Sequence, residues 1–257
     1  MKSYPILTLL LLVTATVTFS QDKKLEMMRG AKLNEPKPPA AMMIVGVNET
    51  VGSITEPGWL IIVSATLLPE EGAAPAVVPS NLKVKMTDEK DKEVTLSFEA
   101  VPPPAKSDEE PTFYWLAAEA ATKSLAPGRY HITLVPVKGE LKGLEIESGD
   151  LRVVEMDPAR SGLLGSLKIQ RSLLLGKIDE ALAEAERLIT ADAENEDAWI
   201  AKGDILMMKD KPDEALKSYD SALALHKDAD SEPLFILERR RAAFFRSLEK
   251  RGVIPPD

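Results

Sequence analysis

The sequence predicts a two-domain α+β protein in which an antiparallel β-sandwich precedes an α-helical domain. Of its 19 prolines, 15 lie at or before Pro158, and proline is poorly tolerated inside helices because it lacks an N–H group. Short runs of alternating apolar and polar residues fill the first half, which is typical of strands. A segment of the second half recurs with a period that indicates repeated helix pairs.

The composition excludes several kinds of site. The chain of 257 residues holds 32 basic and 41 acidic side chains, and its net charge of −9 disfavours a general nucleic-acid binder. It has no cysteine and two histidines, so thiolate metal sites and cysteine nucleophiles are excluded, and histidine-based sites nearly so. We therefore expect a protein that is not an enzyme, with no catalytic residue, no metal site and no cofactor.

Residues 1–20 have the layout of a cleavable secretory signal, with an apolar stretch at residues 6–17 and small residues before Gln21. That stretch would reach roughly 18 Å as a helix, short of the ~30 Å hydrocarbon core of a membrane. We expect a mature chain without a transmembrane segment, exported to the periplasm or the exterior of a bacterial cell. Residues 21–40 are rich in charge and proline and are expected to form a flexible linker.

Residues 41–156 are expected to form the sandwich, from about seven or eight short strands. Residues 82–86 alternate between apolar side chains and lysines, and residues 94–98 repeat the alternation after a polar turn, which predicts a hairpin. The segment Leu125–Tyr130 resembles a turn of immunoglobulin-like bacterial modules. This resemblance implies an immunoglobulin-like sandwich, although the Cys–Trp–Cys pattern of true immunoglobulin domains is absent.

Residues 157–257 are expected to form the helical domain. The segment Lys177–Leu182 recurs in similar form as Lys211–Leu216. The second copy has small, apolar and aromatic residues at the fixed positions Trp199, Gly203, Leu206, Ala215, Tyr219 and Ala222. This pattern resembles the tetratricopeptide repeat family, in which each repeat of about 34 residues is a pair of antiparallel helices.

The resemblance implies two repeats, at about residues 162–195 and 196–229, followed by a capping helix at residues 232–251. The first copy is the weaker match. It has Gly165 where the family has tryptophan and Ile169 where the family has glycine.

In this family the first helix of each pair lines a concave groove that binds peptides. Carried over by position, the groove candidates are Ser166, Gln170, Leu173, Ile200, Asp204, Met207, Leu234, Glu238 and Arg241. The family's carboxylate-clamp pattern is absent, because Ile200 and Asp204 occupy two of its places. We expect charge changes at Asp204 and Arg241 to alter binding and to spare folding. Packing between helices is the alternative for Met207 and Met208.

Other features are open to two interpretations. The basic residues of the last helix are Arg239, Arg240, Arg241, Arg246, Lys250 and Arg251. They indicate either a surface for an acidic partner or anionic lipid, or a solvated face with cations near the helix C-terminus. Asn48 begins a glycosylation acceptor pattern, and residues 108–110 are expected to form a solvated acidic loop. His131 is expected to point outward from a strand and His226 to lie at a helix end.

These observations favour an exported, non-enzymatic protein that binds a protein or peptide in the groove of its repeats. Such a protein would serve as an adaptor or assembly factor of the periplasm or cell envelope. The alternative is a structural or glycan-binding envelope component whose sandwich is the binding module. Exposed aromatic side chains at Tyr114 and Trp115 would favour that alternative.

Overall fold

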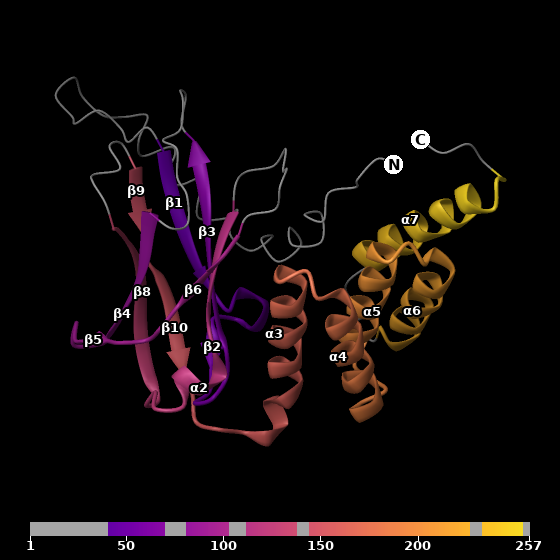
Figure 1. Cartoon of the computed structure of the whole chain (residues 1–257). Coiled ribbons are helices and arrows are strands. Elements are labelled where there is room, and N and C mark those ends of the chain that lie inside the picture. Colours follow the sequence, from indigo (N-terminus) through magenta and orange to yellow (C-terminus); the bar gives the residue numbers. More distant parts are fainter. Residues whose placement is uncertain (1–40, 70–80, 103–111, 138–143, 227–232, 254–257) are drawn as a thin grey trace, which may run out of the picture. The chain divides into compact units, whose positions relative to one another are not determined.

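Figure 1 shows the computed structural model of the chain, which describes residues 41–69, 81–102, 112–137, 144–226 and 233–253. The chain divides into two compact units, with the boundary between Asp157 and Pro158. The expected signal, the expected linker and the acidic loop at residues 108–110 lie outside the described residues.

Within the described residues, the first unit contains two five-stranded sheets that share one hydrophobic core. One sheet has the order β6-β7-β3-β1-β9, with strands at Glu99–Val101, Thr112–Ala117, Ile61–Pro69, Ala41–Val47 and Leu144–Glu147. The other has the order β2-β10-β8-β4-β5, with strands at Ile54–Thr55, Gly149–Val153, Gly128–Pro136, Leu82–Asp88 and Glu93–Val94. Two short helices, η3 (Glu49–Val51) and α2 (Glu119–Thr122), complete the unit.

The core of this unit is filled by alternate residues of the strands. Met43 and Trp115 come from one sheet, Ile132 and Leu151 from the other, and none is more than 2% exposed. Side chains of this size contribute about 1.5–3 kcal/mol each when they are fully buried. The period-2 pattern of the sequence therefore becomes two sheet faces that cover each other.

The prediction of an antiparallel, immunoglobulin-like sandwich is wrong, because both sheets are mixed. β1 pairs with β9 in parallel, and β10 pairs with β2 in parallel, whereas the other strand pairs of the described residues are antiparallel. Alternation of apolar and polar residues marks the two faces of a strand. It is the same for parallel and antiparallel neighbours, so the sequence pattern could not reveal the direction of pairing.

One parallel pairing arises where the chain changes sheets between β9 and β10. Gly149 begins β10, and a Cβ atom at this position would lie 2.7 Å from the carbonyl oxygen of Val45 on β1. Only glycine permits such a close approach to another backbone. The chain can therefore run beside β1 as β9 and then continue beside β8 as β10.

The predicted hairpin of residues 82–86 and 94–98 is present only at its start. β4 and β5 pair through Met86 with Val94 and through Thr87 with Glu93. Leu96 and Phe98 still pack against the core, but they lie outside any strand, and β6 joins the other sheet. The alternation predicted which side chains face the core and could not predict which sheet the chain would join.

The second unit contains five helices within the described residues (Figure 1). A 3₁₀ turn, η5 (Pro158–Arg160), precedes α3 (Ser161–Leu174), α4 (Ile178–Ala191), α5 (Glu196–Met208), α6 (Pro212–Leu225) and α7 (Leu234–Lys250). Short turns join α3 to α4 and α5 to α6. In each turn one residue has a left-handed backbone, Gly176 with φ 69° and Asp210 with φ 56°. None of the described helices is long and apolar enough to cross a membrane.

Local sequence explains where these helices begin. Acidic residues occupy the first turns of α4, α5 and α6, where they interact favourably with the positive end of the helix dipole. The side chain of Asn195 caps α5 by accepting a hydrogen bond of 3.0 Å from the backbone N–H of Ala198. Pro212 lies in the first turn of α6, where its missing N–H needs no partner.

Each helix pair packs against the next helix in sequence. Ala198 and Ile205 of α5 belong to a core cluster with Ala185 and Leu188 of α4. Ile236 and Ala243 of α7 belong to a second cluster, which includes the following residues of α5 and α6: Ile200, Leu206, Ala215, Tyr219 and Ala222. The first helix of one pair therefore covers the second helix of the preceding pair.

Candidate functional site

Asp204, one of the predicted groove residues, lies inside the helical unit. It is 5% exposed. The hydroxyl of Tyr219 donates a hydrogen bond of 2.7 Å to its Oδ1 atom, and Nε of Arg239 donates to both carboxylate oxygens, at 2.9 and 3.1 Å. α5, α6 and α7 thus contribute one residue each to a buried cluster that holds the three helices together.

The environment of this cluster sets its protonation. Burial raises the pKa of the Asp204 carboxyl, while Arg239 and Tyr219 oppose that rise by favouring the charged form. Burial and the neighbouring carboxylate raise the pKa of the Tyr219 phenol, which therefore stays a hydrogen-bond donor. A charge change at Asp204 would leave Arg239 without its buried partner, so the expectation that such a change spares folding does not fit this geometry.

The other groove candidates on α3 and α5 are partly or fully packed. Ile200 is 8% exposed and belongs to the core cluster around Tyr219. Leu173 and Met207 are half-buried against the two clusters, so Met207 takes part in interhelical packing. Ser166 is half-buried, and its hydroxyl donates to the backbone oxygen of Gly162 at 3.4 Å. Gln170 is half-buried as well.

The three candidates on α7, which are Leu234, Glu238 and Arg241, are all exposed. Packing shifts the register of this helix, because Ile236 and Ala243 cover α6 in the way that Ala198 and Ile205 cover α4. By this packing Glu238 corresponds to Ile200, whereas the repeat period matches Leu234 with Ile200. The period therefore places Leu234 and Arg241 in the groove, whereas the packing of α7 shifts the groove positions four residues further along the helix.

Most of the basic residues of α7 are used within the unit. The pairs with the acidic residues of α5, α6 and their turn are Arg239–Asp204, Arg240–Asp220, Arg246–Asp210, Lys250–Asp210 and Arg251–Asp213. Surface ion pairs contribute about 0–1 kcal/mol each, so the exposed members of this set orient α7 more than they stabilise it. Of the six basic residues, Arg239 is largely buried with its partner, while Arg240, Arg241, Lys250 and Arg251 stay exposed to solvent.

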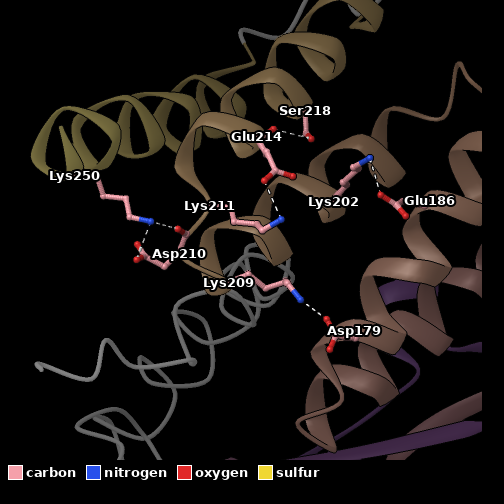
Figure 2. A network of polar contacts seen from close by, with 9 residues as sticks. All are labelled: Asp179, Glu186, Lys202, Lys209, Asp210, Lys211, Glu214, Ser218 and Lys250. Carbon is pink, nitrogen blue, oxygen red and sulfur yellow. Dashed lines mark hydrogen bonds and ion pairs between the residues drawn. The ribbon is translucent and has the colours of Figure 1, made fainter.

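Similar ion pairs link α4 to α5. Figure 2 shows Lys202 beside Glu186, at 2.9 Å, and Lys209 beside Asp179. The same figure shows Lys250 with Asp210, 3.0 Å apart, where the α5–α6 turn meets α7. In both contacts, α4 with α5 and α6 with α7, the earlier helix supplies the acidic residues and the later helix supplies most of the basic ones.

The glycosylation pattern at Asn48 is not accessible in the folded unit. Asn48 is 1% exposed. Its side-chain amide donates to the backbone oxygen of Ile54 at 3.0 Å and accepts from the backbone N–H of Ile62 at 2.8 Å. The side chain therefore ties the η3 turn to neighbouring strands, which is a structural role.

The aromatic pair on β7 does not form an exposed platform. Trp115 is 2% exposed in the core. Tyr114, on the other face of β7, is half-buried, and burial together with the charge of Glu49 raises its pKa to about 12. The observation that would have favoured a glycan site in this unit is therefore missing.

The two histidines have carboxylate partners. His131 is exposed on β8, with Nδ1 2.6 Å from Oδ1 of Asp150. His226 follows α6, with Nδ1 3.1 Å from a carboxylate oxygen of Glu196. Over the residues that the structure describes, no group of three or more histidine, aspartate and glutamate side chains could hold a metal ion.

No protein-family model matches this chain, and no curated protein matches it. The geometry of the two units is therefore what bears on its function. In the helical unit, Leu173 and Met207 are half-buried at equivalent positions of the two helix pairs.

Proposed function

We propose that the chain is an exported, non-enzymatic protein that binds other proteins through its helical unit, a tetratricopeptide-type array. Repetition of structure at equivalent positions of the two helix pairs supports this proposal. Gly176 and Asp210 are both left-handed after a first helix, and Ala181 and Ala215 are both fully buried where two helices meet. Arrays of stacked helix pairs form extended binding surfaces.

The contact surface of the proposed groove consists of the side chains that packing leaves partly open. On α3 and α5 these are Ser166, Gln170, Leu173 and Met207, and Glu238 extends the set on α7. Ile200 and Asp204 lie beneath this surface and support it. The two apolar members suit an apolar side chain of a bound peptide, and methionine adapts to varied shapes. The serine and the glutamine can bind the polar backbone of such a peptide.

Site-specific crosslinking tests this assignment. A photoreactive amino acid is placed at Gln170 or at Met207, and in a control chain at Ala183, which is exposed on α4. We expect both groove positions to crosslink the same envelope protein in living cells, and the control to crosslink it weakly or not at all. Equal labelling from all three positions, or none from the groove, contradicts the proposal.

Export is tested separately. If residues 1–20 are removed on secretion, N-terminal sequencing of the mature protein begins at or near Gln21, and the protein is recovered from the periplasm or the medium. A chain that keeps Met1 and stays with the cytoplasmic proteins would contradict the localisation without touching the groove.

A further inference from the structure

The outward face of α7 is apolar. Leu234, Leu237, Phe244 and Phe245 are 57%, 43%, 47% and 43% exposed. Leu234, Leu237, Arg241, Phe244 and Leu248 follow one another at intervals of three, four, three and four residues, and we name these five residues the α7 seam. Such spacing is typical of a helix that packs along another helix as in a coiled coil. Contiguous exposed apolar side chains commonly mark an interaction site.

Comparison with α5 shows which kind of neighbour this face fits. Ala198 and Ile205 of α5 pack against α4, and the residues that directly follow them, Trp199 and Leu206, pack in the cluster that α5 forms with α6. In α7, Ile236 and Ala243 pack in the same way against α6. The residues that directly follow these two are exposed, and they are Leu237 and Phe244.

α7 therefore presents the face that α5 uses to bind its own second helix. In α5 that second helix, α6, runs antiparallel to it because a short turn joins the two. A partner of α7 that repeats this arrangement is likewise an antiparallel helix with apolar side chains.

The charges on this face indicate what the partner helix carries. Glu238 and Arg241 are both exposed. Neither forms an ion pair with any residue that the structure describes, and the guanidinium of Arg241 lies 5.5 Å from the ring centre of Phe245. An acid and a base one helical turn apart match a second helix that carries the same two residues in the opposite direction.

We propose that the α7 seam is the interface of a homodimer, in which α7 of a second copy packs antiparallel about a two-fold axis. Such an interface is isologous, so each contact occurs twice. Glu238 of each copy faces Arg241 of the other, and the leucine and phenylalanine side chains fill the space between the helices. This inference does not depend on the proposed groove, which consists mainly of residues of α3 and α5 and shares only Glu238 with the dimer interface.

A parallel pair and a lipid surface fit the seam less well. In a parallel pair Arg241 would face Arg241 of the second copy, and like charges at such positions repel. Binding of an amphipathic helix to anionic lipid needs basic residues beside the apolar face. The other basic residues of α7 are paired with acids of α5, α6 and their turn.

Sedimentation of the full chain over a range of concentrations up to about 100 μM tests the dimer and gives its Kd. We expect the wild type to dimerise and Leu237→Glu to weaken the dimer about tenfold or more, while circular dichroism shows unchanged helices. Leu175→Glu, a change at an exposed leucine that follows α3, is the matched control and should dimerise like the wild type. A wild type that stays monomeric throughout this range overturns the proposal.

Charge reversal then tests the antiparallel pairing. Glu238→Arg and Arg241→Glu should each weaken the dimer, because each chain then carries charges of one sign on its seam. An equimolar mixture of the two variants should dimerise again, and so should the double variant Glu238→Arg/Arg241→Glu. If the mixture is no stronger than either variant alone, the proposed pairing is wrong.

A last arm tests the lipid alternative with vesicles of phosphatidylglycerol and phosphatidylethanolamine. We expect no cosedimentation of the wild type with these vesicles. Vesicle binding that is lost in Leu237→Glu, together with a monomeric free protein, would assign the α7 seam to lipid and overturn the dimer. If these experiments exclude the dimer, the crosslinks from Gln170 and Met207 are still expected, so the two proposals can be told apart.

Discussion

The helix pairs α3–α4 and α5–α6 occupy equivalent places in the repeat but distribute large and small side chains in opposite ways. The positions of the first pair and their equivalents one repeat later are Gly165 and Trp199, Ile169 and Gly203, Ala185 and Tyr219, and Leu188 and Ala222. In the first pair Gly165 contacts Leu188 of α4. In the second pair the glycine is Gly203, one helical turn further along the first helix, and it contacts Tyr219 of α6.

The difference teaches that packing constrains facing residues jointly. Protein interiors are packed as densely as organic crystals, so a large residue on one helix requires a small one opposite it. Gly165 and Ile169, which make the first copy a weak match to the repeat pattern, are balanced by Leu188 and Ala185 on α4. A pattern that scores positions singly cannot detect such an exchange.

The second arrangement has a consequence that the first does not. Tyr219 places a hydroxyl against Asp204, which also binds Arg239, so the second pair is bonded to α7 through a buried polar cluster. In the first pair, Ala185 takes the place of Tyr219 and has no polar side-chain group, and Gln170 takes the place of Asp204.

Truncating Tyr219 should have the largest effect on the helical unit. Tyr219→Ala leaves a cavity beside Gly203 and removes a hydrogen bond from buried Asp204, so we expect a loss of about 3–5 kcal/mol in the free energy of unfolding. Tyr219→Phe keeps the ring and should lose about 1 kcal/mol. Denaturant unfolding of the full chain, followed by circular dichroism at helix wavelengths, measures both.

Denaturant unfolding of a double variant tests whether a larger residue at Gly203 compensates for the loss of the Tyr219 ring. Gly203→Ile/Tyr219→Ala gives the second pair the residues of the first, so it should be more stable than Tyr219→Ala alone. If the double variant is less stable than the single one, joint packing does not explain the difference between the pairs.

The next effect concerns the polar cluster. Asp204→Ala leaves Arg239 without its partner, and we expect a loss of about 3 kcal/mol. Gln170→Ala, at the equivalent position of the first pair, should lose less than about 1 kcal/mol. Equal losses in the two variants would show that the cluster adds nothing to the second pair. Melting temperatures from calorimetry compare them directly.

The two glycines should differ by a smaller amount. A Cβ atom at Gly203 meets the rigid ring of Tyr219, while one at Gly165 meets the flexible end of Leu188. We expect Gly203→Ala to lose about 2 kcal/mol and Gly165→Ala about 1, since overpacking typically costs about 1–3 kcal/mol. The reverse order, in urea titrations of the two variants, would contradict the assigned contacts.

The smallest effect concerns pH and tests a similarity between the pairs. Asp213 and its equivalent Asp179 both have a lowered pKa, Asp213 because Ser247 and Arg251 donate hydrogen bonds to it and Asp179 because Lys209 does. A lowered folded-state pKa stabilises the fold above the unfolded value and ceases to do so as the pH falls through the folded value. Asp213→Asn and Asp179→Asn should each make the fall in melting temperature between pH 6 and pH 3 slightly smaller. A fall as large as in the wild type would show that neither carboxylate contributes.

The sequence by itself determined the main features that depend on local pattern. Proline distribution and alternation predicted strands before Pro158, and the scarcity of proline together with the repeated segment predicted helices after it. The repeat predicted connections between the helices of each pair, but not the left-handed backbone at Gly176 and Asp210. Asp204 also gave a signal that could have been used, since it is an acidic residue directly followed by the apolar run Ile205–Met208.

The tertiary structure alone decided which strands are neighbours, in which direction they pair, and how α7 is placed. Parallel and antiparallel pairing bury the same alternating side chains, so the pattern cannot distinguish them; the crossing at Gly149 permits the parallel pairing of β1 with β9. The register of α7 depends on the fit of Ile236 and Ala243 against α6, which moves the helix away from the sequence period. That fit buries Ile236 and Ala243 against α6 and leaves Leu237 and Phe244 exposed, because only one face of the helix can contact α6.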